Sequence, residues 1–544
     1  MLTENEFSPL DNAFANFLIK HTLLTGDERV CFENTVKQLS SQQNQGHNCL
    51  YVNAATQRVL QQSGLVNVAG ISSTLKPLVL ESNRLYLQRY WAYEQELACQ
   101  LHALSQHHYA LASVDTLLDT YFPPSEGIDW QREAAKLALT ERLSIITGGP
   151  GTGKTSTVVK ILALLQSVAS EPLLIALAAP TGKAALRLQT SLGQNAATLA
   201  CSAALKATLP RQVSTLHRLL GVKFGSATFR HNASKPLIYD VIVIDEASMI
   251  DLALMAKLVF ALKPTARLLL LGDKDQLASV ESGAVLADLT HALPAHTIEL
   301  KRAHRFNNDI KQLAEAINKQ HAKHAWQQLN AATQTLHLLT QAQLIPYIAS
   351  EYSHYLQLIK TGADFLTIYD AFNRLSVLCA NRQGKNSVTE INYLVEQALF
   401  AEKHINLTSL WYVGRPVMIT QNNSALQLYN GDIGLCLLYQ HTLMVHFQHA
   451  DGTIKRYLPA RITHCETVYA MTIHKSQGSE FETVIIALPE TMNRALTKEL
   501  LYTAVTRAKQ NIYIRAEKEV FMQTIQQKVE RLTGLADKLS ALQT

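Results

Sequence analysis

Ile145-Ile146-Thr147-Gly148-Gly149-Pro150-Gly151-Thr152-Gly153-Lys154-Thr155 is the stretch that decides the fold of this chain. It fits the pattern G-x-x-x-x-G-K-[ST], which joins a buried strand to a helix. The apolar run 143–146 predicts the strand, and the periodic run 154–165 predicts the helix. Glycines let backbone N–H groups curl around an anion, and the helix N-terminus adds a partial positive charge. The stretch therefore predicts a site for a nucleoside triphosphate.

Two side chains of this loop have expected roles. Lys154 would reach the β- and γ-phosphates of ATP, and the Thr155 hydroxyl would hold Mg²⁺. A glycine-rich turn that fits the pattern by chance is the alternative, and the flanking strand and helix weigh against it. Upstream, Gln131 could present its amide to the adenine edge, although a glutamine at a helix N-terminus is by itself weak evidence for such a contact. The expected ATP-binding residues are Gln131, Gly148, Gly149, Pro150, Gly151, Thr152, Gly153, Lys154, Thr155 and Ser156.

The composition is that of a globular chain with several domains. Its 544 residues suit three or four domains with large cores. No apolar run approaches the length of a membrane span, and the acidic segment 1–7 lacks the features of a signal peptide. The seven cysteines are scattered without a C-x-x-C pair, which favours reduced thiols in a cytoplasm over a disulfide framework or a zinc site. A net charge of +5 is compatible with nucleic acid but does not establish it.

Alternating apolar runs predict an α/β fold. From residue 128 to about 290, strand and helix patterns alternate, which indicates a parallel sheet covered on both faces, with ligands at the strand C-termini. After residue 291 the pattern repeats without a second P-loop. The strands expected in these two regions are 143–146, 173–177, 241–244, 268–271, 375–379 and 484–487.

The chain divides into four expected units. Residues 1–115 hold no catalytic motif; they are either a helical domain that covers the rest or a docking module for a partner, and the pattern favours neither. The other units are a first α/β domain at 116–290, a second at 291–404 and 466–544, and a small β-barrel inserted at 405–465. The expected N-terminal elements are helices at 13–24, 29–39 and 90–104 and a hairpin at 77–87, and the inserted β runs are 416–420, 433–439, 443–447 and 454–458.

Acidic and amide side chains follow two of the expected strands. Asp245 and Glu246 end the apolar run 241–244. Asp245 would hold Mg²⁺ through water, and Glu246 would orient and activate the attacking water. Such a pair could instead cap the following helix, but its position downstream of a P-loop favours catalysis. Gln276, after the strand 268–271, is the candidate γ-phosphate sensor.

Charge that develops on the phosphate must also be met by a cation. An arginine finger contributes about 10³–10⁵ in rate. Arg305 and Arg507 are the two candidates. If Lys154 and Arg507 both contact one ATP, the nucleotide lies in an interdomain cleft whose closure the γ-phosphate controls. A surface salt bridge is the alternative for either arginine.

Three further loops suit the phosphates of a nucleic-acid strand. The segments 179–183, 214–218 and 472–478 offer backbone N–H groups, hydroxyls and cations at the start of a helix. Such contacts give sequence-independent, salt-sensitive binding. The expected DNA-binding residues are Pro180, Thr181, Lys183, Thr215, His217, Thr472, His474, Lys475 and Gln477.

Taken together, the motifs resemble the ordered set of superfamily-one DNA helicases, and most closely the RecD branch. The similarity covers roughly residues 84 to 515. The motifs in order are Gln131, GGPGTGKT (148–155), APTGKAA (179–185), STLHRLLG (214–221), VIDEAS (243–248), LGDKDQLASVESG (271–283), RAHRF (302–306), MTIHKSQGSEF (471–481) and LYTAVTRAK (501–509).

This resemblance implies two RecA-like P-loop domains, a helical N-terminal domain and an SH3-like β-barrel. It implies ATP-driven 5′→3′ movement on single-stranded DNA, in a heterotrimer with RecB-like and RecC-like subunits that processes double-strand breaks. The N-terminal domain would dock on the RecC-like subunit. Family roles carry onto Lys154, Thr155, Asp245, Glu246, Gln276, Arg305 and Arg507 at the nucleotide, and onto Pro180, Thr181, His217, His474 and Gln477 along DNA; Glu480 is a weaker candidate for the ribose.

Two alternatives remain open at this point. One is a stand-alone RecD-like helicase, and the missing long amino-terminal region of such enzymes disfavours it. The other is a regulatory ATPase that controls assembly without translocation, against which the DNA-type loops weigh. No carboxylate-plus-lysine nuclease signature is present, so nuclease activity of the complex is expected in another chain.

Overall fold

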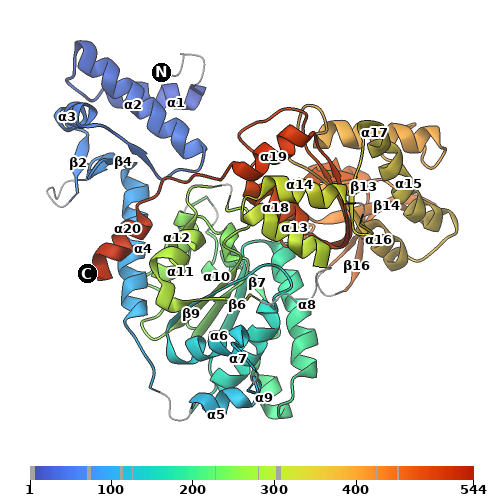
Figure 1. Cartoon of the computed structure of the whole chain (residues 1–544), viewed down its shortest axis with the longest axis horizontal. Coiled ribbons are helices and arrows are strands. Elements are labelled where there is room, and N and C mark those ends of the chain that lie inside the picture. Colours follow the sequence, from blue (N-terminus) through green and yellow to red (C-terminus); the bar gives the residue numbers. More distant parts are fainter. Residues whose placement is uncertain are drawn as a thin grey trace.

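The computed structural model describes residues 7–543 except 70–74, 111–113, 125, 224, 227, 280, 302–307, 332, 424 and 450–451. Four sheets with helices packed around them make up the described residues (Figure 1). Within these residues, no helix combines the length and apolar character needed to cross a membrane.

The sheet that carries the P-loop has six parallel strands in the order β10-β5-β9-β8-β6-β7. Successive residues of one strand enter two different cores: Ile145 packs on one face and Ile146 on the other. This burial on both faces explains the continuous apolar runs of the sequence. The strands are β5 (Leu143–Thr147), β6 (Ile175–Ala179), β7 (Ser214–Thr215), β8 (Val241–Ile244), β9 (Arg267–Gly272) and β10 (Thr297–Glu299).

Helices cover both faces of this first sheet. Residues of α6, α7 and α8 build the core on one face, and residues of α4, α11, α12 and α20 build the core on the other. The helices of this unit are α5 (Val114–Asp119), α6 (Trp130–Thr140), α7 (Lys154–Val168), α8 (Gly182–Thr198), α9 (Ala203–Thr208), α10 (Leu216–Leu220), η2 (Ala247–Met249), α11 (Leu252–Phe260), α12 (Val285–Ala292) and η3 (Pro294–His296).

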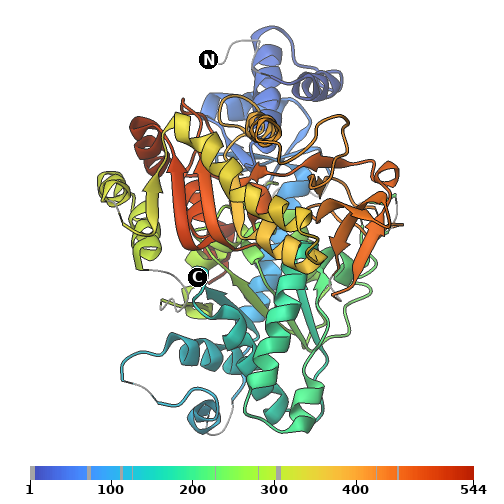
Figure 2. The same ribbon diagram turned by 90° about the vertical axis from the view of Figure 1, so that its right-hand side faces the viewer.

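The second α/β unit has five parallel strands in the order β11-β20-β19-β12-β18. Figure 2 shows the yellow and orange helices of this unit lying over its red strands. The strands are β11 (Leu336–Leu338), β12 (Leu375–Cys379), β18 (Ala470–Thr472), β19 (Phe481–Ala487) and β20 (Ala508–Arg515). The helices are α13 (Asn308–Asn318), α14 (Ala322–Asn330), α15 (Gln341–Lys360), α16 (Phe365–Asn373), α17 (Val388–Ala401), η5 (Ile473–Ser476), α18 (Lys498–Val505) and α19 (Lys518–Gln526).

An antiparallel sheet in the order β16-β15-β14-β13-β17 is inserted into the second unit. Alternate residues face opposite ways: Val417 and Cys436 enter a core of the insert's own, whereas Met418 and Leu435 pack into the core of the second unit. The elements are β13 (Pro416–Ile419), β14 (Ile433–Tyr439), β15 (Thr442–Gln448), β16 (Ile454–Tyr457), η4 (Pro459–Arg461) and β17 (Cys465–Thr467).

The N-terminal unit has a core of its own beneath a small sheet ordered β1-β4-β3-β2. The expected hairpin is present, since β3 and β4 pair antiparallel around a turn at Ser82, whose φ is +54°. The elements are α1 (Pro9–Ile19), α2 (Gly26–Asn44), β1 (Cys49–Tyr51), α3 (Ala54–Gln62), β2 (Val66–Val68), β3 (Leu78–Glu81), β4 (Arg84–Leu87) and α4 (Gln88–Ser105).

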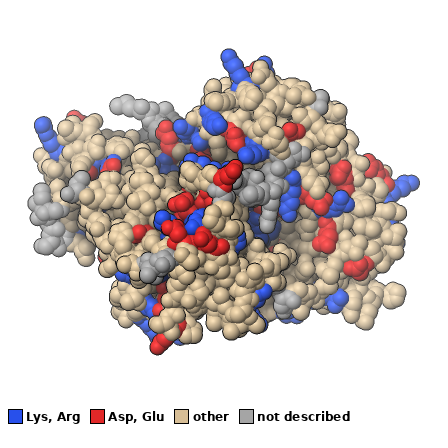
Figure 3. All heavy atoms as spheres, turned by 60° about the horizontal axis from the view of Figure 1, so that its bottom comes forward, with Lys and Arg blue, Asp and Glu red and all other residues tan. Residues whose placement is uncertain are grey.

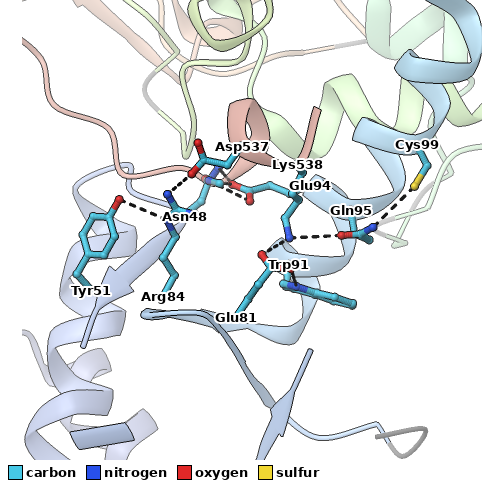
Figure 4. A network of polar contacts seen from close by, with 11 residues as sticks. Asn48, Tyr51, Glu81, Arg84, Trp91, Glu94, Gln95, Cys99, Asp537 and Lys538 are labelled. Atoms are coloured by element: carbon cyan, nitrogen blue, oxygen red, sulfur yellow. Dashed lines mark hydrogen bonds and ion pairs between the residues drawn. The ribbon is translucent and has the colours of Figure 1, made fainter. Parts of the chain in front are cut away.

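The end of the chain returns to its beginning. After α19, residues 527–534, here called the C-terminal strap, lead back to α20 (Leu535–Gln543), which packs along α4. Figure 4 shows the polar contacts at this junction. The buried Glu94 carboxylate accepts hydrogen bonds from Asn48 Nδ2, at 2.8 Å, and from the Gly534 N–H, at 3.1 Å. Lys538 forms an ion pair with Glu81.

Three observations correct the expected boundaries. Strand β10 belongs to the first sheet, so this unit extends beyond residue 290. Strand β17 belongs to the inserted sheet, and α20 packs on the first unit rather than the second. None of these could be seen locally, because Thr297-Ile298-Glu299 and Cys465-Glu466-Thr467 contain one or no aliphatic residue and show no strand pattern.

Candidate functional site

The P-loop follows β5, and α7 begins at its Lys154. The Lys154 ammonium donates hydrogen bonds to the carbonyl oxygens of Gly148, at 2.5 Å, and Gly149, at 3.1 Å. Gly153 precedes the helix with a φ of +86°, and a Cβ there would lie 2.5 Å from Nε2 of Gln131. Glycine alone fits both this left-handed backbone and this close approach. The loop therefore has the tight curvature that an anion-binding helix N-terminus needs.

Gln131 lies against the P-loop, in the first turn of α6. Asp129 caps this helix by accepting hydrogen bonds from the backbone N–H groups of Gln131 and Arg132. The Gln131 amide donates to the carbonyl oxygen of Thr152 at 3.2 Å. The glutamine identified from the sequence is thus beside the loop, and its N–H is engaged by the loop itself.

Asp245 and Glu246 lie where β8 ends. Glu246 has a φ of +53°, which is uncommon outside glycine and typical of strained functional positions. Its N–H donates to Asp245 Oδ1 at 2.9 Å. Burial, followed by repulsion from Glu246, raises the pKa of Asp245 to about 6, while Lys154 favours the charged form. The acidic pair and the P-loop lysine therefore share one electrostatic environment.

The chemistry of this donor set fits Mg²⁺. Mg²⁺ usually takes one or two carboxylates and keeps waters alongside phosphate oxygens. Asp245 offers a carboxylate, and Thr155 offers a hydroxyl. A divalent cation would also relieve the repulsion between the neighbouring carboxylates of Asp245 and Glu246. Among the residues that the structure describes, no group of three or more His, Cys, Asp or Glu side chains could hold a metal ion. A Mg²⁺ assignment here therefore rests on the oxygen donors of Asp245 and Thr155.

Arg507 joins the second α/β unit to the first. It follows α18 and is 1% exposed, and its Nη2 donates to Gln276 Oε1 at 2.7 Å. Its Nε and Nη1 donate to the carbonyl oxygens of Thr503 and Ser479, both at 3.1 Å. Burial lowers the pKa of Arg507, and Glu246 is the largest charge that favours its protonated form. The structure thus brings together two residues singled out from distant motifs.

Other contacts between the units surround this pair. The Leu277 N–H donates to Thr503 Oγ1, and the Gln477 amide donates to the Leu277 carbonyl oxygen, both at 2.8 Å. Gln477 is 8% exposed, so it lies between the units rather than on an open surface. Arg187 of α8 forms an ion pair with Glu480, the residue considered for the ribose. Arg187 was missed from the sequence because nothing local links it to position 480.

Two more residues of the interface, Asp273 and Tyr502, were not singled out individually from the sequence. Asp273 Oδ2 accepts hydrogen bonds from Gln276 Nε2 and from the Tyr502 hydroxyl, both at 3.1 Å. Burial raises the pKa of Asp273 to about 6 and the pKa of Tyr502 well above its ordinary value. Both residues stand inside helicase-like motifs, at 271–283 and 501–509. Which polar residues of those motifs face inward depends on the packing of the two units.

The three loops expected along DNA share one local structure. Each places a threonine at the end of a strand or two residues beyond it, at the N-cap of a helix or 3₁₀ turn. The threonine hydroxyl accepts a hydrogen bond from a backbone N–H three residues later. A hydroxyl that accepts in this way can still donate its proton to a phosphate. The threonines are Thr181, which follows Pro180, Thr215 and Thr472.

Two of these loops meet across the units. A Cβ on Gly478 would lie 3.3 Å from the Cβ of Ala184. Lys183 Nζ lies 5.8 Å from the centre of the Phe481 ring. Burial lowers the pKa of Lys183 to about 8, whereas Asp432 of the inserted sheet favours its charged form. The cation of one loop therefore lies near an aromatic ring just after the other loop and within the electrostatic influence of a carboxylate of the insert.

The remaining expected residues take varied positions. Burial lowers the pKa of His217 in α10 and of His474 in η5, so both are largely neutral at pH 7. Lys475 donates to Glu466 at 3.1 Å. Arg305, the other candidate finger, lies outside the described residues.

Figure 3 shows how charge is distributed on one face of the molecule. Lys and Arg side chains lie among Asp and Glu side chains, and both signs gather near its middle. The net charge of +5 is therefore not concentrated in a single basic surface on this face.

Two family models match within the α/β units. The model described as an AAA domain matches residues 131–282, from Gln131 to the loop beyond Gln276. The model described as a UvrD-like helicase C-terminal domain matches residues 467–514, which hold Gln477, Tyr502 and Arg507.

Relatives extend the match over most of the chain. The RecBCD enzyme subunit RecD of Mycolicibacterium smegmatis is 39% identical over 472 residues, which are 85% of this chain and 83% of that protein. The corresponding subunit of Haemophilus influenzae is 35% identical over 536 residues, covering 86% and 82%. The ATP-dependent RecD2 DNA helicase of Deinococcus radiodurans is 32% identical over 81% of this chain and 58% of that protein. A solved structure of Bacteroides Pif1 helicase with ADP-AlF3 and ssDNA has a TM-score of 0.42 and 18% identity, covering 73% of this chain and 94% of that one. Because the identity to the RecD subunits runs through most of both chains, this chain belongs to the RecD family of ATP-dependent DNA helicases.

Proposed function

We propose that this chain is the RecD subunit of a RecBCD complex and moves 5′→3′ along single-stranded DNA at double-strand break ends, in repair by homologous recombination. The contact of Arg507 with Gln276 carries the proposal, because it ties the second unit to the ATP site of the first. A translocase needs such a link, since the nucleotide at one domain must change its relation to the other. The similarity to RecD subunits supports the assembly.

At the nucleotide, we assign binding to the P-loop and bond cleavage to the acidic pair. Lys154 and the loop N–H groups would bind the β- and γ-phosphates. Thr155 and Asp245 would hold Mg²⁺, which neutralises phosphate charge when bound. Glu246 would hold the attacking water and accept its proton. The strained backbone of Glu246 and its place beside Asp245 support this division of roles.

Arg507 and Gln276 would respond to the γ-phosphate. A guanidinium that already contacts the first unit can move onto charge that develops during hydrolysis with little reorganisation. Gln276 would follow the change from triphosphate to diphosphate, and Arg507 would transmit it to the second unit. Arg305 stays a candidate for a second cation at this site. Gln131 stays a candidate for the adenine edge.

We further propose that DNA follows the threonine-capped loops of both units. Thr181 lies two residues beyond the end of β6, Thr215 ends the neighbouring strand β7, and Thr472 ends the edge strand β18 of the second sheet. Lys183, His217, His474 and Lys475 would add side-chain contacts beside them, whereas Gln477 is engaged between the units. A step of the motor would change the distance between the loops of the first unit, at Thr181 and Thr215, and the loop of the second unit, at Thr472.

The N-terminal unit is proposed to dock on the RecC-like subunit. Its first two helices expose large apolar side chains, including Leu10 at 65% and Phe17 at 60%, seven positions apart on one face of α1. Co-purification of the subunits should fail with Leu10→Ser/Phe17→Ser if this face docks.

We also propose that the inserted sheet is an SH3-like barrel and that the two parallel sheets belong to RecA-like domains. We propose the cytoplasm as the location of the protein, because its cysteines are unpaired.

Strand displacement tests the proposal. The purified chain, alone and with its partner subunits, is offered duplexes with either a 5′ or a 3′ single-stranded tail, with Lys154→Gln as control. We expect unwinding only from the 5′ tail and none with Lys154→Gln. Unwinding from the 3′ tail would contradict the polarity. ATP turnover indifferent to DNA would instead indicate the regulatory switch, and full activity without partners would favour a stand-alone helicase.

A further inference from the structure

The loop that follows β9, residues 273–277, is held in place by side chains of the second α/β unit. Tyr502 donates its hydroxyl proton to Asp273, Thr503 accepts from the Leu277 N–H, and Gln477 donates to the Leu277 carbonyl oxygen. Because Gln276 lies within this loop, its position depends on residues of the other domain.

Asp273 is the branch point of these contacts. Its Oδ2 accepts from Gln276 Nε2 and from the Tyr502 hydroxyl at 3.1 Å each, and the residue is 2% exposed. A carboxylate can only accept, so it fixes the Gln276 amide with its nitrogen toward Asp273. The Gln276 oxygen then faces Arg507, which can only donate. One carboxylate therefore sets the orientation of the amide that Arg507 contacts.

Tyr502 also lies against the P-loop. A Cβ on Gly149 would stand 3.1 Å from the Tyr502 hydroxyl oxygen, so a glycine at this position permits the close approach. Tyr502 and Arg507 belong to one segment, α18 and the turn after it. A continuous chain of buried hydrogen bonds thus crosses between the units twice. It runs from Tyr502 of the second unit to Asp273 and Gln276 of the first, and back to Arg507 of the second.

We propose that Tyr502 and Asp273 are positioning residues that set the register of the two domains, so that Gln276 and Arg507 meet the γ-phosphate together. This inference rests on the proposed ATP site. The tyrosine fixes where α18 lies relative to the P-loop, and Asp273 fixes the amide of Gln276. Neither residue needs to contact the reacting atoms. Loss of either would leave the phosphates bound by the P-loop but misplace the groups that act on developing charge.

Tyr502→Phe tests this directly, since it removes one oxygen and keeps the ring. We expect kcat for DNA-stimulated ATP hydrolysis to fall about tenfold, the factor that one hydrogen bond to a charged group is worth. The Kd for ATP, measured with a fluorescent ATP analogue, should change less than about twofold, because the lost contact is not to the bound phosphates. Asp273→Asn should give a similar loss. The double variant should lose no more than either single variant, since both break one path.

Tyr352→Phe is the matched control. Tyr352, on α15 of the same unit, is also buried and donates a single hydroxyl hydrogen bond, to the Tyr469 carbonyl oxygen at 2.7 Å. It should lower stability about as much as Tyr502→Phe and leave kcat unchanged. An unchanged kcat in Tyr502→Phe, additive losses in the double variant, or an equal loss in Tyr352→Phe would overturn the inference. Hydrolysis that survives Lys154→Gln would instead overturn the proposed ATP site.

Discussion

Arg507 is the residue that, in the proposed function, would link ATP to movement most directly. Its guanidinium makes three hydrogen bonds while nearly completely buried, and each goes to a neutral oxygen. A buried cation held by neutral acceptors gains when an anion arrives, because opposite charges attract more strongly in a poorly solvated site. A γ-phosphate beside Lys154 is the anion that the site suits.

Arg507→Ala should spare ATP binding and abolish most hydrolysis. In its proposed role, Arg507 acts on charge that develops in the transition state, so its loss should lower single-turnover hydrolysis about 10³-fold. Arg507→Lys keeps the charge but lacks the planar fork of the guanidinium, which spreads its donors toward Gln276, Thr503 and Ser479, so an intermediate rate is expected. The Kd of ATP and the hydrolysis rate are measured separately on each variant. Tight binding with undiminished turnover in Arg507→Ala would reject the assignment.

Residues of this site differ in how far the sequence could identify them. Lys154, Asp245 and Glu246 follow apolar strands at recognisable spacing, so local pattern was enough to single them out. Asp273 and Tyr502 acquire their importance from each other, across 229 positions of chain. From the sequence, Gln477 was expected to contact DNA together with the other polar residues of segment 472–478. Only the packing of the two units shows that its amide is engaged with Leu277.

At the scale of the element, the N-termini of α8, α10 and η5 place similar polar groups at the ends of strands. Each begins with a threonine cap, and the two loops at α8 and η5 touch across the units. A helix N-terminus attracts phosphate through its free N–H groups and its dipole. The Lys183 ammonium stands in the first turn of α8 and should strengthen this attraction while it is protonated.

Binding of single-stranded DNA should therefore weaken as the pH rises through 8. Burial lowers the pKa of Lys183 to about 8, so its charge is present below pH 8 and is lost above it. Phosphate prefers the ammonium form, so the affinity for an oligonucleotide should fall from pH 7 to 9 and the salt slope should shrink by about one ion. In Lys183→Arg, which stays charged, affinity should be nearly constant over this range. Equal pH profiles of the two proteins would contradict the prediction.

Elements with strong local patterns were predictable, and elements that depend on neighbours were not. Strands 241–244 and 375–379 were expected with the bounds that the structure has, because burial on both faces favours a nearly continuous apolar run, interrupted in the second strand only by Ser376. Strand β10 was missed because it is three residues long and alternates with polar side chains at the edge of its sheet. Such a strand gains its structure from pairing with β5 rather than from its own composition.

At the scale of the whole molecule, the C-terminal strap fastens three units to one another. Arg531 donates to the carbonyl oxygens of Gln45, at 3.0 Å, and Ser279, at 3.1 Å. Val529 is held by Glu499 of the second unit at 3.0 Å. The strap therefore joins the N-terminal unit, the loop after Gln276 and α18. No local pattern could predict this, since Glu94 and Gly534 are 440 positions apart.

Glu94 should make the strap sensitive to pH. Burial raises the pKa of Glu94 to about 7 from an ordinary 4.5. Because the folded state then holds the proton more tightly than the unfolded chain, the stabilising contribution is full below about pH 4.5 and is lost as the pH rises to 7. Glu94→Gln keeps an oxygen that can accept from Asn48 and Gly534. Its melting temperature should exceed that of the parent at pH 8, with the gap closing toward pH 5. A gap that widens as the pH falls would contradict this.

Gly534→Ala should release the C-terminal helix and act on the proposed ATP site only indirectly, through the strap. A Cβ at Gly534 would lie 2.2 Å from the Tyr86 hydroxyl oxygen and 2.9 Å from Glu94 Oε2, and both of those residues are fully buried. Neither can move aside cheaply, so α20 should detach and expose the strap to trypsin at Lys528 and Arg531. Since Arg531 donates a hydrogen bond to the carbonyl of Ser279, the loop after Gln276 should loosen and DNA-stimulated ATP turnover should fall.

The matched control is Gly193→Ala on α8. A Cβ there meets nothing within 4 Å, and alanine favours the helix by up to about 1 kcal/mol. Trypsin sensitivity together with normal turnover would show that the strap fastens the units but does not tune the ATP site. Trypsin sensitivity together with reduced turnover would show that the three units work as one.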